Sequence, residues 1–411
     1  MSRLEVRLRR AGLSARELTR HAASLRAALA RLDAGTGGEF LRVIHERRYL
    51  REISRCVASA PPGLTDVVQL GIGGSSLGAH ALCRALLPPR RQGLRWHFPD
   101  NIDPESFGPL LERLDPRRTL VHVVSKSGGT LETLAQLHAL LARWAGRSDL
   151  GKRFVVTTGD SGPLRDFAEE YAAPLLSAPA DVAGRFSVFT ASGLFVPALC
   201  GVPVGRVLAG AREMLVRCRE DRALGPAGRL ATLHHEHDRR GRSIHVELIY
   251  GDALLPLGEW FRQIWAESLG KGGRGPTPIV ARGTTDQHSQ IQLYVDGPDD
   301  KLYTLLRVGR SRSQVRVARG AQPSHIRGRS LGEIFRAQEQ GTLQALRQRG
   351  RPLVELCLER VSASGIGELL LLQQLQTALA GELYGVNPFD QPGVEAGKRA
   401  AARILRASRR R

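Results

Sequence analysis

Residues 121–133, V-H-V-V-S-K-S-G-G-T-L-E-T, decide the fold class of this 411-residue chain. The β-branched run at their start is typical of a buried parallel strand, and leucines at helical spacing follow the Ser- and Gly-containing loop. Free backbone N–H groups at the start of a helix, beside hydroxyls and Lys126, suit a bound phosphate. Because Lys126 precedes the glycines, the loop differs from the nucleotide P-loop and predicts a small phosphorylated ligand.

Strand and helix patterns alternate around this stretch. Strands are predicted at 67–70, 94–98, 120–124 and 154–158, with helices at 77–87 and 104–114. Such alternation favours a parallel, doubly wound α/β sheet that binds ligands beyond the carboxyl ends of its strands. The loop G-I-G-G-S-S at 71–76 is close to a dinucleotide fingerprint, but Ser76 stands where the third glycine belongs. A nicotinamide dehydrogenase is therefore not expected.

A second α/β unit is predicted after Gly201. Its strands are expected at 243–250, 301–308 and 352–358, its helices at 257–269, 330–348 and 366–384, and a last helix from Pro392. The chain divides into a helical N-terminal segment (1–50), a first domain (51–200), a second domain (201–385) and a C-terminal segment (386–411). The predicted fold is α/β, with two similar halves around one cleft.

The chain is strongly basic, with a formal net charge of +20 and 60 Lys and Arg residues. Arginine is spread along the sequence and aromatic residues make up only 5%, which offers little for base stacking, so no nucleic-acid partner is expected. Only five of the basic residues are lysines. If arginine has replaced lysine wherever either cation serves, Lys126, Lys271 and Lys398 occupy positions that need a compact ammonium.

Other features of composition indicate a cytoplasmic protein without a membrane partner. No apolar run approaches 18 residues, and the N-terminal residues mix charges from the start. The five cysteines form neither a metal knuckle nor a C-x-x-C pair, so they are expected to be reduced and mostly buried.

Two segments carry candidate groups for acid–base chemistry. Gln263 and Glu267 lie four residues apart on the helix predicted at 257–269, so both side chains project from one face. Glu267 is either an ordinary surface carboxylate or a general base. Arg185, in G-R-F-S, is either a solvated charge or a fixed cation for developing negative charge.

Two further segments carry polar groups beside glycine turns. His288 follows G-T-T-D-Q, where it is either a structural histidine or an acid–base group. Gln391 and Lys398 lie seven residues apart, about two helical turns, so both can face one cleft.

The run H-H-E-H-D at 234–238 invites a metal assignment. Its residues are contiguous, so a helix would spread them over several faces, and no second cluster has matching spacing. The run is interpreted as a solvated helix face, and no metal is expected.

Six motifs together resemble the glucose-6-phosphate isomerase family, in its order. They are G-I-G-G-S-S-L-G (71–78), S-K-S-G-G-T-L-E-T (125–133), G-R-F-S (184–187), Q-I-W-A-E-S-L-G-K (263–271), G-T-T-D-Q-H-S-Q (283–290) and F-D-Q-P-G-V-E-A-G-K (389–398). The resemblance implies two sugar isomerase (SIS) domains, flavodoxin-like α/β sandwiches with mainly parallel sheets, and a homodimer without a cofactor.

The resemblance also implies roles for individual residues. The phosphate-binding residues would be Ser125, Lys126, Ser127, Thr130 and Thr133, with Ser75 nearby. Glu267 would be the base that moves a proton between C1 and C2, and Arg185 would stabilise the enediolate. His288 and Lys398 would assist ring opening and proton transfer at the ring and C5 oxygens. Gln263 and Gln391 would line the sugar. His288 would come from the partner subunit.

The expected reaction is the interconversion of glucose 6-phosphate and fructose 6-phosphate. Gly128-Gly129 stand where many family members carry bulkier or hydroxyl residues, which leaves a dual glucose/mannose phosphate isomerase open. A non-catalytic SIS sensor of sugar phosphates is the other alternative. A sensor would need the phosphate loop but not Glu267, Arg185, His288 and Lys398 together, so their joint presence favours the enzyme.

Overall fold

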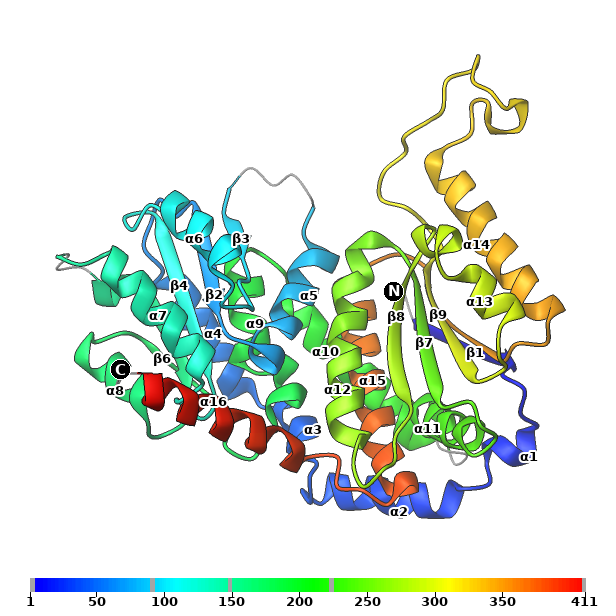
Figure 1. The fold of residues 1–411 in the computed structure, drawn as a ribbon, viewed down its shortest axis with the longest axis horizontal. Coiled ribbons are helices and arrows are strands. Elements are labelled where there is room, and N and C mark those ends of the chain that lie inside the picture. Colours follow the sequence, from blue (N-terminus) through cyan, green and yellow to red (C-terminus); the bar gives the residue numbers. More distant parts are fainter. Residues whose placement is uncertain (1–3, 89–92, 147–149, 222–224, 409–411) are drawn as a thin grey trace.

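The computed structural model describes residues 4–88, 93–146, 150–221 and 225–408, which form two five-stranded sheets (Figure 1). The first sheet has the strand order β3-β2-β4-β5-β6, and every pair in it is parallel. Its strands are β2 (Asp66–Leu70), β3 (Arg95–His97), β4 (Thr119–Ser125), β5 (Phe154–Thr158) and β6 (Leu175–Ser177). The predicted parallel, doubly wound sheet is confirmed.

The second sheet has the order β1-β10-β9-β7-β8. Its strands are β1 (Leu4–Arg10), β7 (Ile244–Tyr250), β8 (Thr277–Gly283), β9 (Lys301–Val308) and β10 (Leu353–Leu358). All pairs are parallel except β1, which runs antiparallel to β10 with Leu4 opposite Leu358.

The sequence predicted a helical N-terminal segment at residues 1–50. The segment is instead part strand and part helix. Residues 4–10 alternate apolar and charged side chains, the period of a strand, and Leu4 is fully buried. The short helices that follow are α1 (Ala15–Leu18), α2 (Ala22–Asp33) and α3 (Glu39–Val43). The segment therefore begins as an edge strand of the second sheet.

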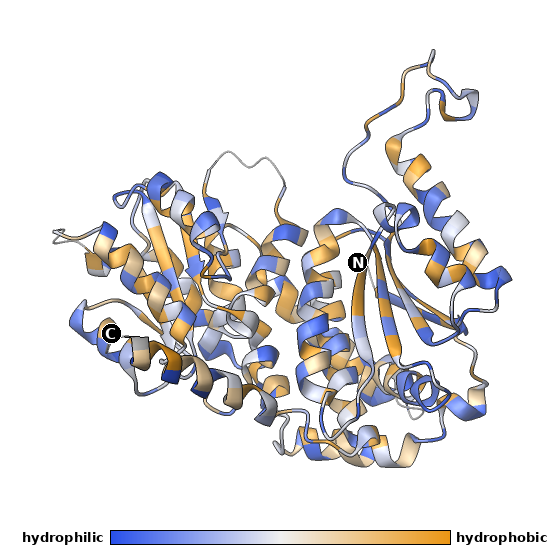
Figure 2. Ribbon diagram, in the orientation of Figure 1, coloured by the Kyte–Doolittle hydropathy of each residue, from blue (hydrophilic) through white to orange (hydrophobic). Residues whose placement is uncertain are grey.

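The helices form three layers around the sheets (Figures 1 and 2). The outer face of the first sheet packs against α6 (Pro104–Arg113), α7 (Leu131–Arg143) and α8 (Pro163–Glu170), and that of the second against α13 (Ile291–Asp296) and α14 (Leu331–Gln348). The largest core lies between the sheets and includes α4 (Arg47–Ala58), α5 (Leu77–Leu86), α9 (Ala191–Leu199), α10 (Val204–Glu220), α11 (Gly225–Asp238), α12 (Leu255–Leu269) and α15 (Ala363–Tyr384). Since the leucines at 369–372 are all fully buried, α15 is a core helix.

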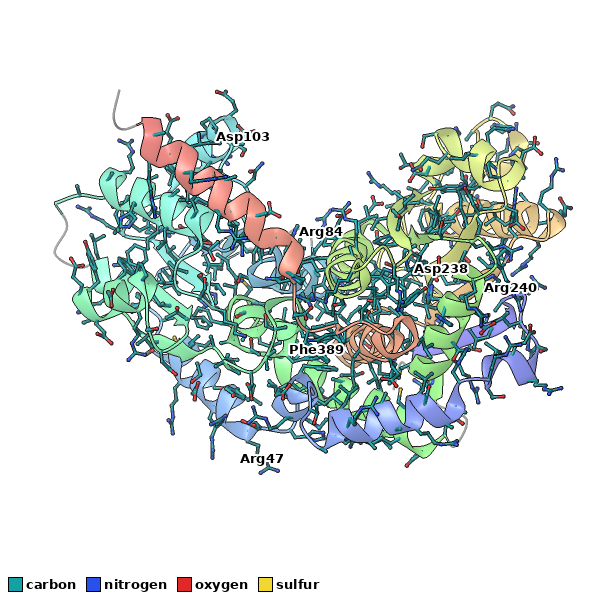
Figure 3. The ribbon with its side chains drawn as sticks, turned by 60° about the horizontal axis from the view of Figure 1, so that its bottom comes forward. Arg47, Arg84, Asp103, Asp238, Arg240 and Phe389 are labelled. Carbon is teal, nitrogen blue, oxygen red and sulfur yellow. The ribbon has the colours of Figure 1, made fainter. Side chains whose placement is uncertain are left out.

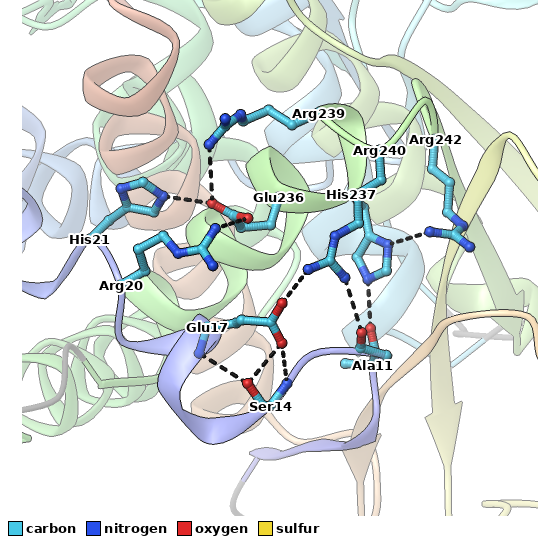
Figure 4. Close-up of polar contacts among 11 residues, drawn as sticks. Ala11, Ser14, Glu17, Arg20, His21, Glu236, His237, Arg239, Arg240 and Arg242 are labelled. Atoms are coloured by element: carbon cyan, nitrogen blue, oxygen red, sulfur yellow. Dashed lines mark hydrogen bonds and ion pairs between the residues drawn. The ribbon is translucent and has the colours of Figure 1, made fainter.

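The expected solvated face at 234–238 is wrong. On α11, the side chains of His234, Glu236 and His237 are almost fully buried. The N-terminal segment covers Glu236 and His237: His21 Nε2 lies 2.8 Å from Glu236 Oε1, and His237 Nε2 lies 2.6 Å from the Ala11 carbonyl oxygen (Figure 4). These two contacts come from residues more than 200 positions earlier, which local spacing cannot reveal. The His234 ring packs instead against Trp265, with 4.7 Å between the ring centroids.

The expectations for cysteine and for membrane helices are also tested. None of the five cysteines, all of which lie in the described ranges, forms a disulfide; four are buried and Cys357 is partly buried. Within the described ranges, no helix is long and apolar enough to cross a membrane.

Candidate active site

Polar groups from both halves of the chain meet beyond the carboxyl end of β2. The loop after β2 forms a short 3-10 turn, Gly73–Ser75, which lies against a second one, Gly184–Phe189. A Cβ on Gly74 would lie 2.3 Å from the Gly184 carbonyl oxygen, and one on Gly73 would lie 2.6 Å from Gln263 Nε2. The glycines that suggested a nucleotide fingerprint serve this close approach.

Arg185 is a buried cation that four hydrogen bonds hold in place. Its side chain is only 1% exposed. Nε donates to Ser268 Oγ at 2.8 Å, Nη1 to Gln391 Oε1 at 3.2 Å, and Nη2 to the carbonyl oxygens of Pro388 and Asp390 at 2.5 and 2.7 Å. Burial lowers the pKa of Arg185, but a guanidinium stays charged because its ordinary pKa exceeds 12. The cation is therefore held rigidly before any ligand binds.

Glu267 stands at the end of α12, beside this cation. Its Oε2 lies 3.6 Å from Arg185 Nη1, and its Oε1 accepts a 3.0 Å hydrogen bond from Gln263 Nε2. The Glu267 side chain is 30% exposed, so a ligand can reach the carboxylate. Gln263 Oε1 is buried without a hydrogen-bond partner among the described residues, which leaves an acceptor for a ligand hydroxyl. The predicted pair on one helix face is thus an accessible carboxylate with a hydrogen-bonded neighbour.

The loop between β4 and α7 brings the predicted phosphate ligands together. Ser125 Oγ lies 2.8 Å from Thr130 Oγ1 and 3.5 Å from Ser127 Oγ. Thr130 is the N-cap residue of α7, but its side chain makes no capping bond to the helix. The first N–H groups of a 13-residue helix therefore face the same loop as three hydroxyls, a suitable cradle for a phosphate.

The remaining predicted phosphate groups flank this loop. Lys126 Nζ donates to the Val182 carbonyl oxygen at 2.8 Å, three residues before Arg185, and desolvation lowers the pKa of Lys126. Thr133 is buried in the first turn of α7, and its Oγ1 has no partner among the described residues. Ser75 is partly exposed in the glycine loop, where its carbonyl oxygen accepts from Gln69 Nε2 at 2.7 Å.

Among the described residues, no hydrogen bond or ion pair joins His288 to this group. His288 is exposed on the 3-10 turn Thr285–His288, directly after β8. No hydrogen bond or ion pair between described residues connects His288 with Glu267. Lys398 is exposed on α16 (Glu395–Ser408), and Gln391 reaches the site through its bond to Arg185.

Sequence reasoning missed the groups that hold Arg185. Ser268 directly follows Glu267 and is fully buried, and the carbonyl oxygens of Pro388 and Asp390 come from a turn about 200 residues later. Lys271, noted from the sequence only as a retained lysine, binds the carbonyl oxygen and the carboxylate of Asp390 in the same turn. The one local signal for these groups in the sequence was Ser268, a small hydroxyl residue directly after the candidate base Glu267.

One cluster of described residues has the geometry of a metal site. Ligand atoms of His21, His235 and Glu236 all lie within 4.8 Å of one another. However, Glu236 Oε2 already pairs with Arg20 at 2.8 Å, and its Oε1 with His21 at 2.8 Å (Figure 4). With a guanidinium on the same carboxylate, the cluster is better suited to fastening the N-terminal segment than to binding a cation.

The two mainly parallel sheets, the hydroxyl-lined loop at the start of α7 and the carboxylate beside a fixed cation define an α/β protein of the SIS type, a class that acts on small sugar phosphates. The phosphoglucose isomerase family model matches residues 48–295 and 306–410, and the chain belongs to that family.

Individual relatives agree with this assignment. The chain is 42% identical over 406 residues to the glucose-6-phosphate isomerase of Rubrobacter xylanophilus, covering 94% of this chain and 93% of that protein. A Thermus thermophilus structure described as a hypothetical protein superposes with a TM-score of 0.91 at 35% identity, covering 98% of this chain and 99% of the other. The glucose-6-phosphate isomerase of Chlamydia trachomatis superposes with a TM-score of 0.76 at 23% identity, covering 99% and 81%, which supports the fold alone. The family resemblance and the fold class are confirmed.

Proposed function

We propose that the chain interconverts glucose 6-phosphate and fructose 6-phosphate, with Glu267 as the base. The observation that carries the proposal is the accessible Glu267 carboxylate, 3.6 Å from the immobilised Arg185 guanidinium. An aldose–ketose isomerisation by proton transfer needs a base and a nearby cation for the intermediate, and it needs no redox group. The relatives named glucose-6-phosphate isomerase favour this reaction over a sugar-phosphate sensor.

The phosphate loop supplies orientation. The hydroxyls of Ser125, Ser127 and Thr130, the start of α7 and Lys126 bind the phosphate at C6, with Thr133 and Ser75 flanking it. Because C6 is remote from C1 and C2, the binding energy of the phosphate positions the reacting carbons at Glu267.

The proton transfer then runs between two carbons. In the open-chain aldose, Glu267 removes the proton from C2, and the C–H electron pair moves into a C1–C2 double bond while O1 gains negative charge. Arg185 stabilises that enediolate, and its four protein hydrogen bonds mean that it need not reorganise as the charge develops. The hydroxyl proton of O2 passes to O1, and Glu267 returns its proton to C1. The electron pair of the C1–C2 double bond forms the new C1–H bond, and an electron pair of O2 forms the C2=O bond of the ketose. Gln263, through its free Oε1, and Gln391 line the sugar.

Ring opening is assigned to His288 and Lys398. His288 is exposed in the single chain and has no contact with Glu267. We therefore place the working site in a homodimer, with the partner subunit's His288 completing it. Lys398 acts at the ring and C5 oxygens from α16.

The test is a coupled assay that follows glucose 6-phosphate formed from fructose 6-phosphate by the purified chain. Turnover without added cofactor or metal, and no mannose 6-phosphate at equilibrium, is the expected result. Formation of both aldose phosphates at similar rates would instead establish dual specificity. Tight binding of fructose 6-phosphate without any turnover would establish the sensor. The cytoplasmic location expected from the charged N-terminus stays a prediction.

A further inference from the structure

The turn 387–390 connects α15 to the segment that carries Gln391 and Lys398, and two cations from other parts of the chain hold it. Arg185 Nη2 binds the carbonyl oxygens of Pro388 and Asp390 from one side. Lys271 Nζ binds the carbonyl oxygens of Asn387 and Asp390 from the other, the latter at 2.8 Å, and pairs with Asp390 Oδ1 at 2.7 Å. All three N–H donors of the Lys271 ammonium are used on one turn.

The turn also has bonds of its own. Asn387 Nδ2 donates to Asp390 Oδ2 at 3.1 Å, and Asn387 Oδ1 accepts from the Phe389 backbone N–H at 3.0 Å. The Phe389 ring packs against Phe186, with 5.2 Å between ring centroids, and is labelled where α15 and α16 approach each other (Figure 3). The turn is thereby pinned to the 3-10 segment that carries Arg185.

Lys271 itself is well placed for this task. It stands two residues beyond Leu269, the end of α12, so the helix that presents Glu267 also presents the ammonium. Its side chain is only 13% exposed, and its hydrogen bond lowers the pKa of Asp390, which keeps that carboxyl charged. Lysine is rare in this chain, and the planar fork of arginine cannot direct three donors at acceptors clustered around one point.

We propose that Lys271 is a positioning residue for the isomerase site: by binding Asn387 and Asp390 it fixes the turn that holds Gln391 against Arg185 and sets the start of α16 relative to Glu267. This inference rests on the proposed function. Lys271 touches none of the reacting atoms in it; it acts through Gln391 and the turn.

The first test is the variant Lys271→Met, which keeps an unbranched side chain only one atom shorter and removes the donors. We expect kcat to fall about 10-fold or more, because displacements near 1 Å in an active site have effects of this size. We expect KM to stay within about 2-fold and competitive inhibition by inorganic phosphate to be unchanged, since the phosphate loop is untouched. Lys152→Met, at an exposed lysine distant from the site, is the matched control with wild-type kinetics.

A double-mutant cycle separates positioning from a general effect on stability. If Lys271 acts through Gln391, then Gln391→Ala causes little further loss of kcat in the Lys271→Met background. Additive losses, or wild-type kcat in Lys271→Met, would overturn the proposal. If Lys271→Met does not fold, Asp390→Asn is the second test. It removes the charge from the ion pair with Lys271 and leaves the two carbonyl oxygens that Lys271 binds in place. If the wild-type chain shows no turnover, the proposed function itself is refuted. If the wild-type chain is active and Lys271→Met keeps its kcat, only the role of Lys271 is refuted.

Discussion

Arg185 Nη1 and Glu267 Oε2 lie 3.6 Å apart, and the two side chains differ sharply in freedom. Arg185 is 1% exposed and bound to four protein acceptors. Glu267 is 30% exposed and, among the described residues, is hydrogen-bonded by Gln263 alone apart from this ion pair. A fixed cation beside an accessible carboxylate suits a reaction in which the carboxylate exchanges a proton and the cation meets the charge that results.

Replacing Glu267 by Gln should abolish isomerisation without unfolding the chain. The amide keeps the size and the contact with Gln263 but cannot accept a proton, and general bases contribute about 10²- to 10⁴-fold to rates. Steady-state kinetics with fructose 6-phosphate measures the loss. Glu259→Gln, at a partly exposed carboxylate on the same helix, serves as the control. Full turnover in Glu267→Gln would remove Glu267 as the base.

Arg185→Lys should lower both activity and stability, although the charge is kept. Lysine cannot reach four acceptors at once, so the buried carbonyl oxygen of Pro388 loses its Arg185 donor, at about 1–3 kcal/mol for an unsatisfied group. We expect kcat to fall about 10²-fold, in line with the loss of one donor to a developing oxyanion. Denaturant unfolding and kinetics give the two quantities. Arg206→Lys, at an exposed arginine, should change neither.

Local patterns in the sequence predicted much of this fold. The strand and helix around Ser125 were placed within a residue or two, because a β-branched run and leucines at helical spacing record the burial of each element directly. The same patterns missed β1. Its alternation is short and rich in arginine, and its partner β10 lies about 350 residues away.

Local spacing predicted part of the geometry of the candidate site, but not the contacts between distant segments. Glu267 and Gln263 share a helix face, which spacing reveals. The acceptors around Arg185 come from residues about 80 and 200 positions later, so only the folded chain shows why that arginine is immobile. The burial of Glu236 and His237 was missed for the same reason, since the N-terminal segment covers them.

Lys398→Arg should impair turnover about 10-fold while leaving stability unchanged. Lys398 is exposed on α16, so its replacement costs little packing, but a planar fork cannot deliver a compact ammonium to one sugar oxygen. The comparison is kcat in Lys398→Arg against Arg399→Lys, the reverse exchange one position along the same helix. Wild-type kinetics in Lys398→Arg would end the argument from retained lysines.

Glu247 should make the chain less stable as pH rises. It is buried on β7, where desolvation raises its pKa from 4.5 to about 8, opposed by a hydrogen bond from Gln373. A raised pKa in the folded state means that its stabilising contribution is complete below pH 4.5 and is lost as pH rises to about 8. Glu247→Gln should therefore gain about 1–3 kcal/mol relative to wild type between pH 5 and 8. Urea unfolding at both pH values measures this difference. A difference that does not vary with pH, as expected for the exposed Glu169→Gln, would contradict it.

Mixing two inactive variants tests whether His288 works across a dimer. His288 is exposed and makes no contact with Glu267 in the single chain, so we expect each site to combine Glu267 of one subunit with the partner subunit's His288. A mixed dimer of Glu267→Gln and His288→Ala chains then contains one site with both groups intact. Random exchange at equal amounts should restore roughly a quarter of the wild-type activity, because about half of the dimers are mixed and each has one working site. If His288 served its own chain, every site in the mixture would lack one group, and no activity would return. Sedimentation of the mixture confirms that dimers are present, and an affinity tag on one variant, used to capture the untagged variant, confirms that subunits have been exchanged.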